Sequence, residues 1–133
     1  MAIKPETQFI IGVHKYVPHF IYRMKNNNPY IGGIPDVWYS GNKADLWVEY
    51  KYIERIPQRA LILPALTELQ LKWLQDRHQE GRNVAVIVGC PEGGAWYDNL
   101  AWETSLTNNE FRTQLRSRKE LAKHITFLTG DSI

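Results

Sequence analysis

Alternating apolar and polar side chains predict three strands in the first half of the chain. Residues 19–24 are a short run of aromatic and β-branched side chains, and residues 36–40 and 44–53 follow with a glycine-containing turn between them. Within residues 44–53 two sets of side chains alternate, which places them on opposite faces of a strand. The first set is Leu46, Val48, Tyr50 and Tyr52, and the second is Asp45, Trp47, Glu49, Lys51 and Ile53.

The helical spacing of apolar side chains predicts three helices. Residues 5–17 carry one apolar face and end before a proline. Residues 67–79 form the clearest helix, because Thr67 can cap its start and Gly81 follows its end. A last helix is expected from residue 107 or 108 to about residue 124.

The order of these elements predicts the fold class. Residues 83–88 are a short run of Val, Ala and Ile that is typical of a buried strand, residues 90–94 predict a turn, and residues 95–103 predict a further strand. Helices and strands in this order indicate an α/β sandwich around a central mixed sheet of four to five strands. The middle helix is expected to connect the third and fourth strands.

Composition narrows the class of protein. A chain of 133 residues suits one domain, residues 1–133, and five Trp and seven Tyr supply large core side chains. The net charge is only +2, so a DNA site would need locally gathered charge. Cys90 is the only cysteine, which excludes an internal disulfide and fits a reducing cytoplasm. Charges interrupt the apolar runs, so we expect neither a signal peptide nor a membrane span.

Asp36, Glu49 and Lys51 are the strongest candidates for chemistry. A period of two puts Glu49 and Lys51 on one face of a strand, and a hairpin can bring Asp36 alongside them. Two carboxylates of this kind suit Mg²⁺, which can polarise a phosphate oxygen and activate a water, while Lys51 can hold that water. The alternative is a solvated strand face. Trp47 and Ile53 share the face, which argues against that alternative.

Four short segments between residues 20 and 88 resemble a nuclease family. They are similar to the PD-(D/E)XK superfamily, and most like its VRR-NUC branch, which is related to Holliday-junction resolvases of archaea and phages. The resemblance implies a restriction-endonuclease-like α/β/α sandwich and a metal-dependent endonuclease that hydrolyses DNA phosphodiester bonds, with branched DNA as one expected substrate. The segments are Gly33-Ile34-Pro35-Asp36, Glu49-Tyr50-Lys51, Thr67-Glu68-Leu69-Gln70 and Gly81-Arg82-Asn83-Val84-Ala85-Val86.

The resemblance also implies a role for individual residues. Asp36, Glu49 and the backbone carbonyl of Tyr50 would bind Mg²⁺, for which Mn²⁺ would substitute, and Lys51 would be the catalytic lysine. Gln70 would lie at the edge of the site, although an exposed helix position is the alternative. Three further residues have weaker counterparts in the family. Glu6 would complete the metal ligands or be a favourable first-turn charge, and Arg23 and Asn26 would contact phosphate.

Four basic residues in the last predicted helix are spaced by four, three and four positions. This spacing predicts one basic stripe, which would contact phosphates that flank the cut or would be a solvated helix face. The residues are Arg112, Arg116, Lys119 and Lys123. A long apolar segment between Lys51 and Gln70 could be a lid, a dimer surface or core.

Three functional readings follow. The first is the endonuclease, expected by resemblance to act as a homodimer, and in the host cytoplasm if a phage encodes it. The second is a DNA-binding or partner-binding module on the same fold that does not cut. The third is a nuclease for RNA or single strands. For it, Trp96, Tyr97 and Trp102 could stack on bases or could simply be core.

Overall fold

One mixed sheet forms the centre of the molecule. The computed structural model describes residues 3–26 and 32–130, and in them six strands follow one another in chain order across the sheet. Strands β3 and β4 are parallel, and every other neighbouring pair is antiparallel. The strands are β1 (Tyr22–Lys25), β2 (Val37–Ser40), β3 (Asp45–Tyr52), β4 (Val84–Cys90), β5 (Gly93–Tyr97) and β6 (Leu115–Arg116).

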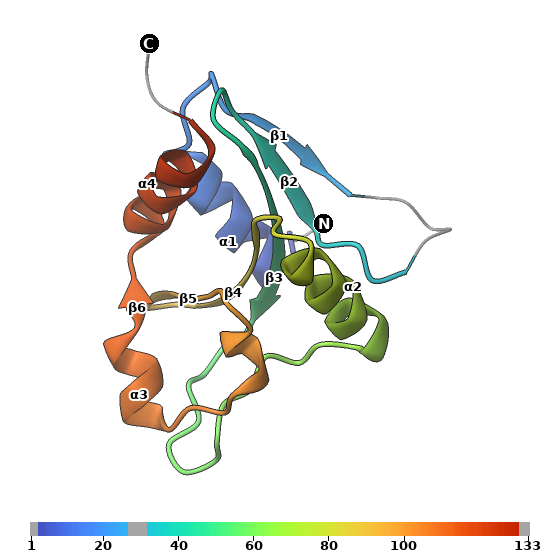
Figure 1. The fold of residues 1–133 in the computed structure, drawn as a ribbon. Helices are drawn as coiled ribbons and strands as arrows, with labels where there is room; N and C mark the ends of the chain where they lie inside the picture. The colour runs from blue at the N-terminus through green and yellow to red at the C-terminus, as the bar shows by residue number, and fades with distance from the viewer. Residues whose placement is uncertain (1–2, 27–31, 131–133) are drawn as a thin grey trace.

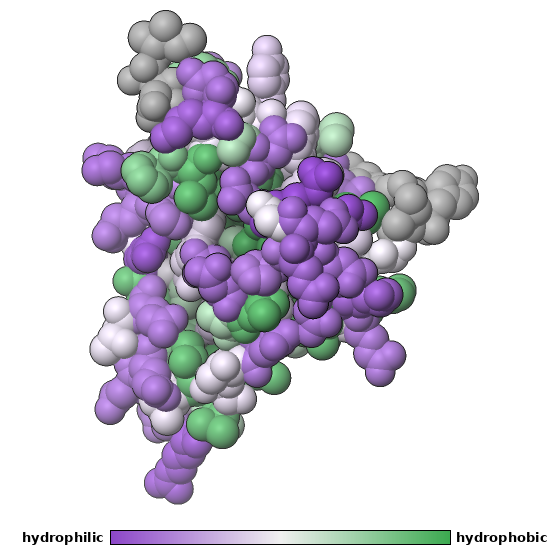
Figure 2. All heavy atoms as spheres, viewed as in Figure 1, coloured by the Kyte–Doolittle hydropathy of each residue, from purple (hydrophilic) through white to green (hydrophobic). Residues whose placement is uncertain are grey.

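Helices cover both faces of this sheet (Figure 1). Helices α1 (Pro5–His14) and α4 (Arg118–Thr129) pack on one face, where Phe9, Val13 and Ile125 meet the buried side of β3. Helix α2 (Glu68–Gln79), the 3-10 turn η1 (Ala101–Glu103) and helix α3 (Asn108–Thr113) pack on the other face. The outward surface of α2 is hydrophilic (Figure 2). The predicted α/β/α sandwich is therefore confirmed.

The alternation in β3 and the crossover through α2 match the prediction. Leu46, Val48 and Tyr50 are at most 1% exposed, in the core with α1 and α4. The opposite set faces α2, which joins β3 to the parallel strand β4. Helix α2 begins at a capping box. In it the Thr67 hydroxyl accepts from the Gln70 backbone at 3.1 Å, and Gln70 Oε1 accepts from the Thr67 backbone at 2.9 Å.

The last third of the chain corrects the prediction of one long helix. The segment forms two helices, α3 and α4, with the two-residue strand β6 between them, and β6 is the strand that makes six rather than four to five. A second capping box, from Ser117 to Glu120, starts α4 as a new helix. The prediction that a single helix carries the four basic residues is therefore wrong. Arg112 lies on α3, Arg116 on β6, and Lys119 and Lys123 on α4.

Smaller differences concern element ends. Helix α1 stops at His14 rather than residue 17, and β1 begins at Tyr22 rather than residue 19. The turn predicted over residues 90–94 shortens to two residues, because Cys90 ends β4 and Gly93 begins β5. Among the described residues, no helix has the length and apolar character that crossing a membrane requires.

Candidate active site

The loop that carries Asp36 is fixed by contact with the start of α2. Gly33 has a positive φ of 88°, and a Cβ added there would lie 2.5 Å from the Leu69 backbone oxygen. Only glycine tolerates both conditions without displacement of the loop. Asn26 braces the same loop, because its backbone N–H donates to the Asp36 carbonyl at 2.7 Å and its side chain donates to the Ile34 carbonyl at 3.4 Å.

Asp36 and Glu49 lie side by side at the start of β2. Val37 pairs with Val48 in the antiparallel register, so Asp36 lies opposite Glu49. Asp36 Oδ2 accepts a hydrogen bond of 2.9 Å from the Tyr50 backbone N–H. The hairpin therefore brings the two predicted acids together, as the sequence indicates.

Glu49 is a buried carboxylate with an incomplete set of partners. It is 2% exposed, and its Oε2 lies 3.4 Å from Lys51 Nζ and 3.2 Å from Gln70 Nε2, which donates to it. Among the described residues, nothing donates a hydrogen bond to Oε1. Burial, and then the negative charge of Asp36, raise the pKa of Glu49 to about 8, although Lys51 acts in the opposite direction. The positive charge of Lys51 is therefore not enough to hold this carboxyl group ionised at neutral pH.

The capping box of α2 determines how Gln70 meets Glu49. Gln70 Oε1 is occupied by the Thr67 backbone N–H, so the amide nitrogen is the end that remains to contact Glu49. Gln70 is half-buried rather than a freely exposed helix position. Lys51, whose side chain is 23% exposed, is open to a ligand, whereas Glu49 is buried.

Glu6 lies near the cluster without joining it. Burial and the charge of Asp36 raise the pKa of Glu6, while the charges of Lys51 and Lys25 lower it, so the first turn of α1 lies within electrostatic range of the site. No group of three His, Cys, Asp or Glu side chains that could hold a metal occurs in residues 3–26 and 32–130. Glu6 therefore does not complete a three-carboxylate cluster with Asp36 and Glu49 in this conformation.

The donor set nevertheless fits a hard divalent cation. Asp36 and Glu49 supply carboxylate oxygens, and Glu49 Oε1 has no donor from the described protein. Oxygen ligands are those that Mg²⁺ prefers, and Mg²⁺ commonly keeps waters where the protein supplies few ligands. The backbone carbonyl of Tyr50 as a further ligand stays a prediction.

The predicted phosphate contacts lie away from this cluster or have structural partners. Arg23 Nη1 donates to the carbonyls of Val17 and His14, at 3.2 and 3.5 Å, and so caps the end of α1. Helix α4, with Lys119 and Lys123, covers the opposite face of the sheet from Glu49. Strand β6, with Arg116, is three strands away from β3, and Arg112 pairs with Glu92 at 3.5 Å.

Aromatic side chains beside the site were missed by sequence reasoning. Trp38, Trp47 and Trp73 are half-buried on the α2 side of the sheet, and the ring of Trp47 lies 6.2 Å from Trp38 and 5.5 Å from Trp73. The alternation of β3 already placed Trp47 beside Glu49, but nothing local linked it to Trp73. Of the two alternatives for Trp96, Tyr97 and Trp102, the structure supports core packing and not a stacking surface, because these residues are 8%, 1% and 1% exposed.

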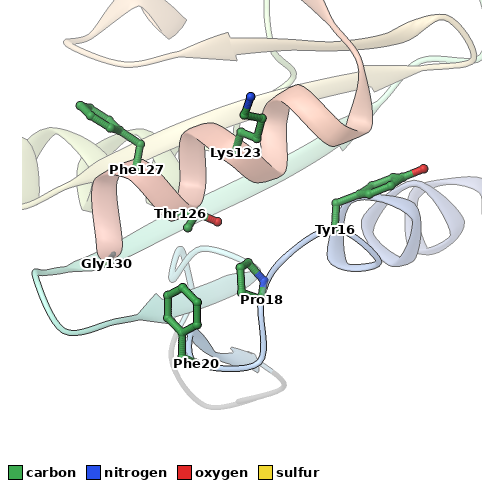
Figure 3. A pocket seen from close by; sticks show the side chains of 7 residues that line it. All are labelled: Tyr16, Pro18, Phe20, Lys123, Thr126, Phe127 and Gly130. Atoms are coloured by element: carbon green, nitrogen blue, oxygen red, sulfur yellow. The ribbon is translucent and has the colours of Figure 1, made fainter. Parts of the chain in front are cut away.

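A hollow away from this cluster lies between α4 and the segment that follows α1. It has a volume of about 390 Å³. Tyr16, Phe20 and Phe127 line it together with Lys123 (Figure 3). No carboxylate lines this hollow, so it offers no ligands of the kind found at Asp36 and Glu49.

The sheet order, the crossover through α2 and the two helical layers define a restriction-endonuclease-like fold. Among solved structures, this chain is similar to Hjc, a Holliday junction resolvase from the archaeal hyperthermophile Archaeoglobus fulgidus. The similarity covers 90% of this chain and 97% of Hjc, with a TM-score of 0.53 and 12% sequence identity, and therefore concerns the fold. No protein-family model matches the chain, and no curated protein matches it in sequence.

Proposed function

We propose that this protein is a metal-dependent endonuclease that hydrolyses phosphodiester bonds in DNA. The observation that carries the proposal is the buried carboxylate of Glu49, which has an oxygen without a donor and lies beside Asp36 and Lys51. Two adjacent carboxylates would repel a phosphate unless a cation lay between the carboxylates and the phosphate. The nuclease-type fold of the chain supports the proposal independently.

In this proposal each residue of the cluster has a defined role. Asp36 and Glu49 would hold Mg²⁺, or Mn²⁺ in its place. The bound cation would polarise a phosphate oxygen and lower the pKa of a water. Lys51 would orient that water and stabilise negative charge as it develops on the phosphate, because its side chain is 23% exposed beside Glu49. Gln70 holds the Glu49 carboxylate in place through its amide nitrogen.

Branched DNA is the substrate class that we propose within this activity. Hjc, which shares the fold, is a Holliday junction resolvase. The four motifs resemble the VRR-NUC branch, although no protein-family model matches the chain. A four-way junction has two strands to cut, so a two-fold homodimer is expected with this substrate. The homodimer and the phage host cytoplasm stay predictions.

A binding module that does not cut is the second candidate. Two observations favour it. Within the described residues no three metal-ligating side chains gather, and a pKa of about 8 leaves Glu49 mostly protonated at neutral pH without a cation. The two candidates differ in whether a cation binds and cleavage follows.

A cleavage assay separates them. A labelled four-way junction, a linear duplex and a single strand would each be incubated with Mg²⁺, with Mn²⁺ and with EDTA, and Asp36→Asn would be assayed beside the wild type. Metal-dependent cutting that Asp36→Asn abolishes supports the nuclease, and preference for the junction supports branched DNA. Folded wild-type protein that binds DNA but cuts none of the three supports the binding module.

A further inference from the structure

Three tryptophans form a row on the sheet face that carries Glu49 and Lys51. Trp38 of β2 pairs in register with Trp47 of β3, and Trp73 of α2 meets Trp47 edge to face at 65°. All three side chains are half-buried, whereas Trp96 and Trp102 are buried in the core. The row therefore presents aromatic surface to solvent beside α2.

A hollow along this row adjoins the candidate active site. It has a volume of about 290 Å³ and is lined by Trp47, Trp73, Ile34, Arg77 and Arg82. Ile34 belongs to the loop that carries Asp36. Trp47 precedes Glu49 by two positions on the same face of β3, which corresponds to about 7 Å along the strand. One or two nucleotides can span such a distance.

The charges around the hollow favour a phosphate-bearing ligand. The Arg77 guanidinium lies 5.4 Å from the centre of the Trp73 ring. Arg77 and Arg82 share a single carboxylate, Glu80, at 2.8 and 3.2 Å, so the three residues together carry a net positive charge. Arginine beside a half-exposed aromatic ring is the combination that binds a base by stacking and its phosphate by charge.

We infer that this surface stacks an unpaired base of the DNA substrate next to the phosphate that is cut. The inference rests on the proposed nuclease function and specifies its substrate as DNA with unpaired nucleotides at the cleavage point, such as a fork or an opened branch point. In an intact duplex both faces of each base are covered by neighbouring bases. A stacking surface therefore distinguishes unpaired from paired nucleotides, without reading sequence.

A binding experiment in EDTA tests this independently of cleavage. Fluorescence anisotropy would measure the affinity for a forked DNA with a single-stranded arm of thymidines and for a fully paired duplex of the same length. The variants are Trp73→Leu, which keeps apolar packing but removes the ring, Trp73→Tyr as the conservative rescue, and Phe127→Ala. Phe127 is a 66% exposed aromatic on the far side of the sheet, which makes it a matched control.

We expect Trp73→Leu to weaken binding of the fork about tenfold, within the range measured for one stacked base, and to change duplex binding less than twofold. Trp73→Tyr should restore fork affinity to within about threefold, and Phe127→Ala should leave it unchanged. Trp38→Leu, on β2, gives a second test that does not alter α2. Equal losses for fork and duplex, or no loss from either variant while thermal unfolding stays native-like, overturn the stacking surface.

The outcomes separate this inference from the nuclease proposal. Wild-type protein that cuts DNA, with an unchanged ratio of fork to duplex binding in both variants, overturns the stacking surface and leaves the nuclease intact. Wild-type protein that never cuts, but prefers forks in a Trp73-dependent way, supports the stacking surface and overturns the nuclease.

Discussion

Replacing Glu49 with glutamine should stabilise the metal-free protein, and the gain should grow as the pH rises. Burial, and secondarily Asp36, raise the pKa of Glu49 from 4.5 to about 8. Between these two values the native state keeps a proton that the unfolded state releases. The contribution of Glu49 to the stability of the wild type is therefore fully present below pH 4.5 and is lost as the pH rises through 8. Glutamine resembles the protonated acid at every pH.

The magnitude follows from the pKa. At roughly 1.4 kcal/mol for each tenfold change in an ionisation constant, a rise from 4.5 to about 8 corresponds to about 5 kcal/mol once the native carboxyl is ionised. At pH 7 most of the native molecules still carry the proton, and the expected advantage of Glu49→Gln is about 3 kcal/mol. The difference between variant and wild type should grow by about 1.4 kcal/mol per pH unit between pH 5 and 8.

Urea unfolding in EDTA across pH 5 to 9 measures this difference. Glu54→Gln is the matched control, because Glu54 is an exposed carboxylate two residues beyond β3 and its replacement should leave stability nearly unchanged at every pH. A stability difference between Glu49→Gln and the wild type that does not vary with pH would refute the reasoning about burial. So would a Glu49→Gln protein that is less stable than the wild type at pH 8.

Mg²⁺ should reduce the stability advantage of Glu49→Gln over the wild type. A cation that binds only the native state stabilises it by mass action, and the wild type can offer an ionised Glu49 whereas Glu49→Gln cannot. The free energy of unfolding of the wild type should therefore rise more in about 10 mM Mg²⁺ at pH 8 than at pH 6. Equal gains in stability for the wild type and Glu49→Gln would show that Glu49 is not a metal ligand.

Three further changes test the surroundings of the site. Gly33→Ala forces a Cβ against the Leu69 carbonyl. This change should lower the free energy of unfolding by more than about 1 kcal/mol in urea titrations, and it should slow cleavage. Unchanged stability would mean that the loop does not depend on this contact. Thr67→Ala should cost about 1 kcal/mol through the lost cap, and unaltered stability would contradict that role. Reversing the charge of Lys119 and Lys123, which lie on α4 across the sheet from Glu49, should change DNA binding less than about twofold, whereas a large loss with a weaker salt dependence would show that this face contacts phosphates.

The parts of the fold that local patterns encode were predictable. The period of two in β3 and the capped helix α2 each depend on neighbours within a few residues, and both are as expected. The break between α3 and α4 was missed although the sequence holds a signal for it, since Ser117 and Glu120 form a capping box inside an otherwise helical pattern. The pairing of β6 with β5 is a tertiary contact that no local pattern reports.

The same distinction applies to the candidate site. Alternation and a hairpin were enough to bring Asp36 and Glu49 together. The tie between Gln70 and Glu49 depends on where α2 packs, and it joins residues 21 positions apart. The tryptophan row was missed because Trp73 and Trp47 lie on different elements, and aromatic residues usually indicate core.

Lys51→Ala, measured by single-turnover cleavage of DNA in Mg²⁺, tests the central claim most directly. Lys72→Ala is the control, because Lys72 is an exposed lysine of α2 that pairs with Asp76. If Lys51 stabilises the charge that develops on the phosphate, Lys51→Ala should slow cleavage at least about 100-fold while DNA binding and folding stay intact. Lys72→Ala should cut DNA at the wild-type rate. Cleavage by Lys51→Ala at the wild-type rate would contradict the assignment of this cluster as a nuclease active site.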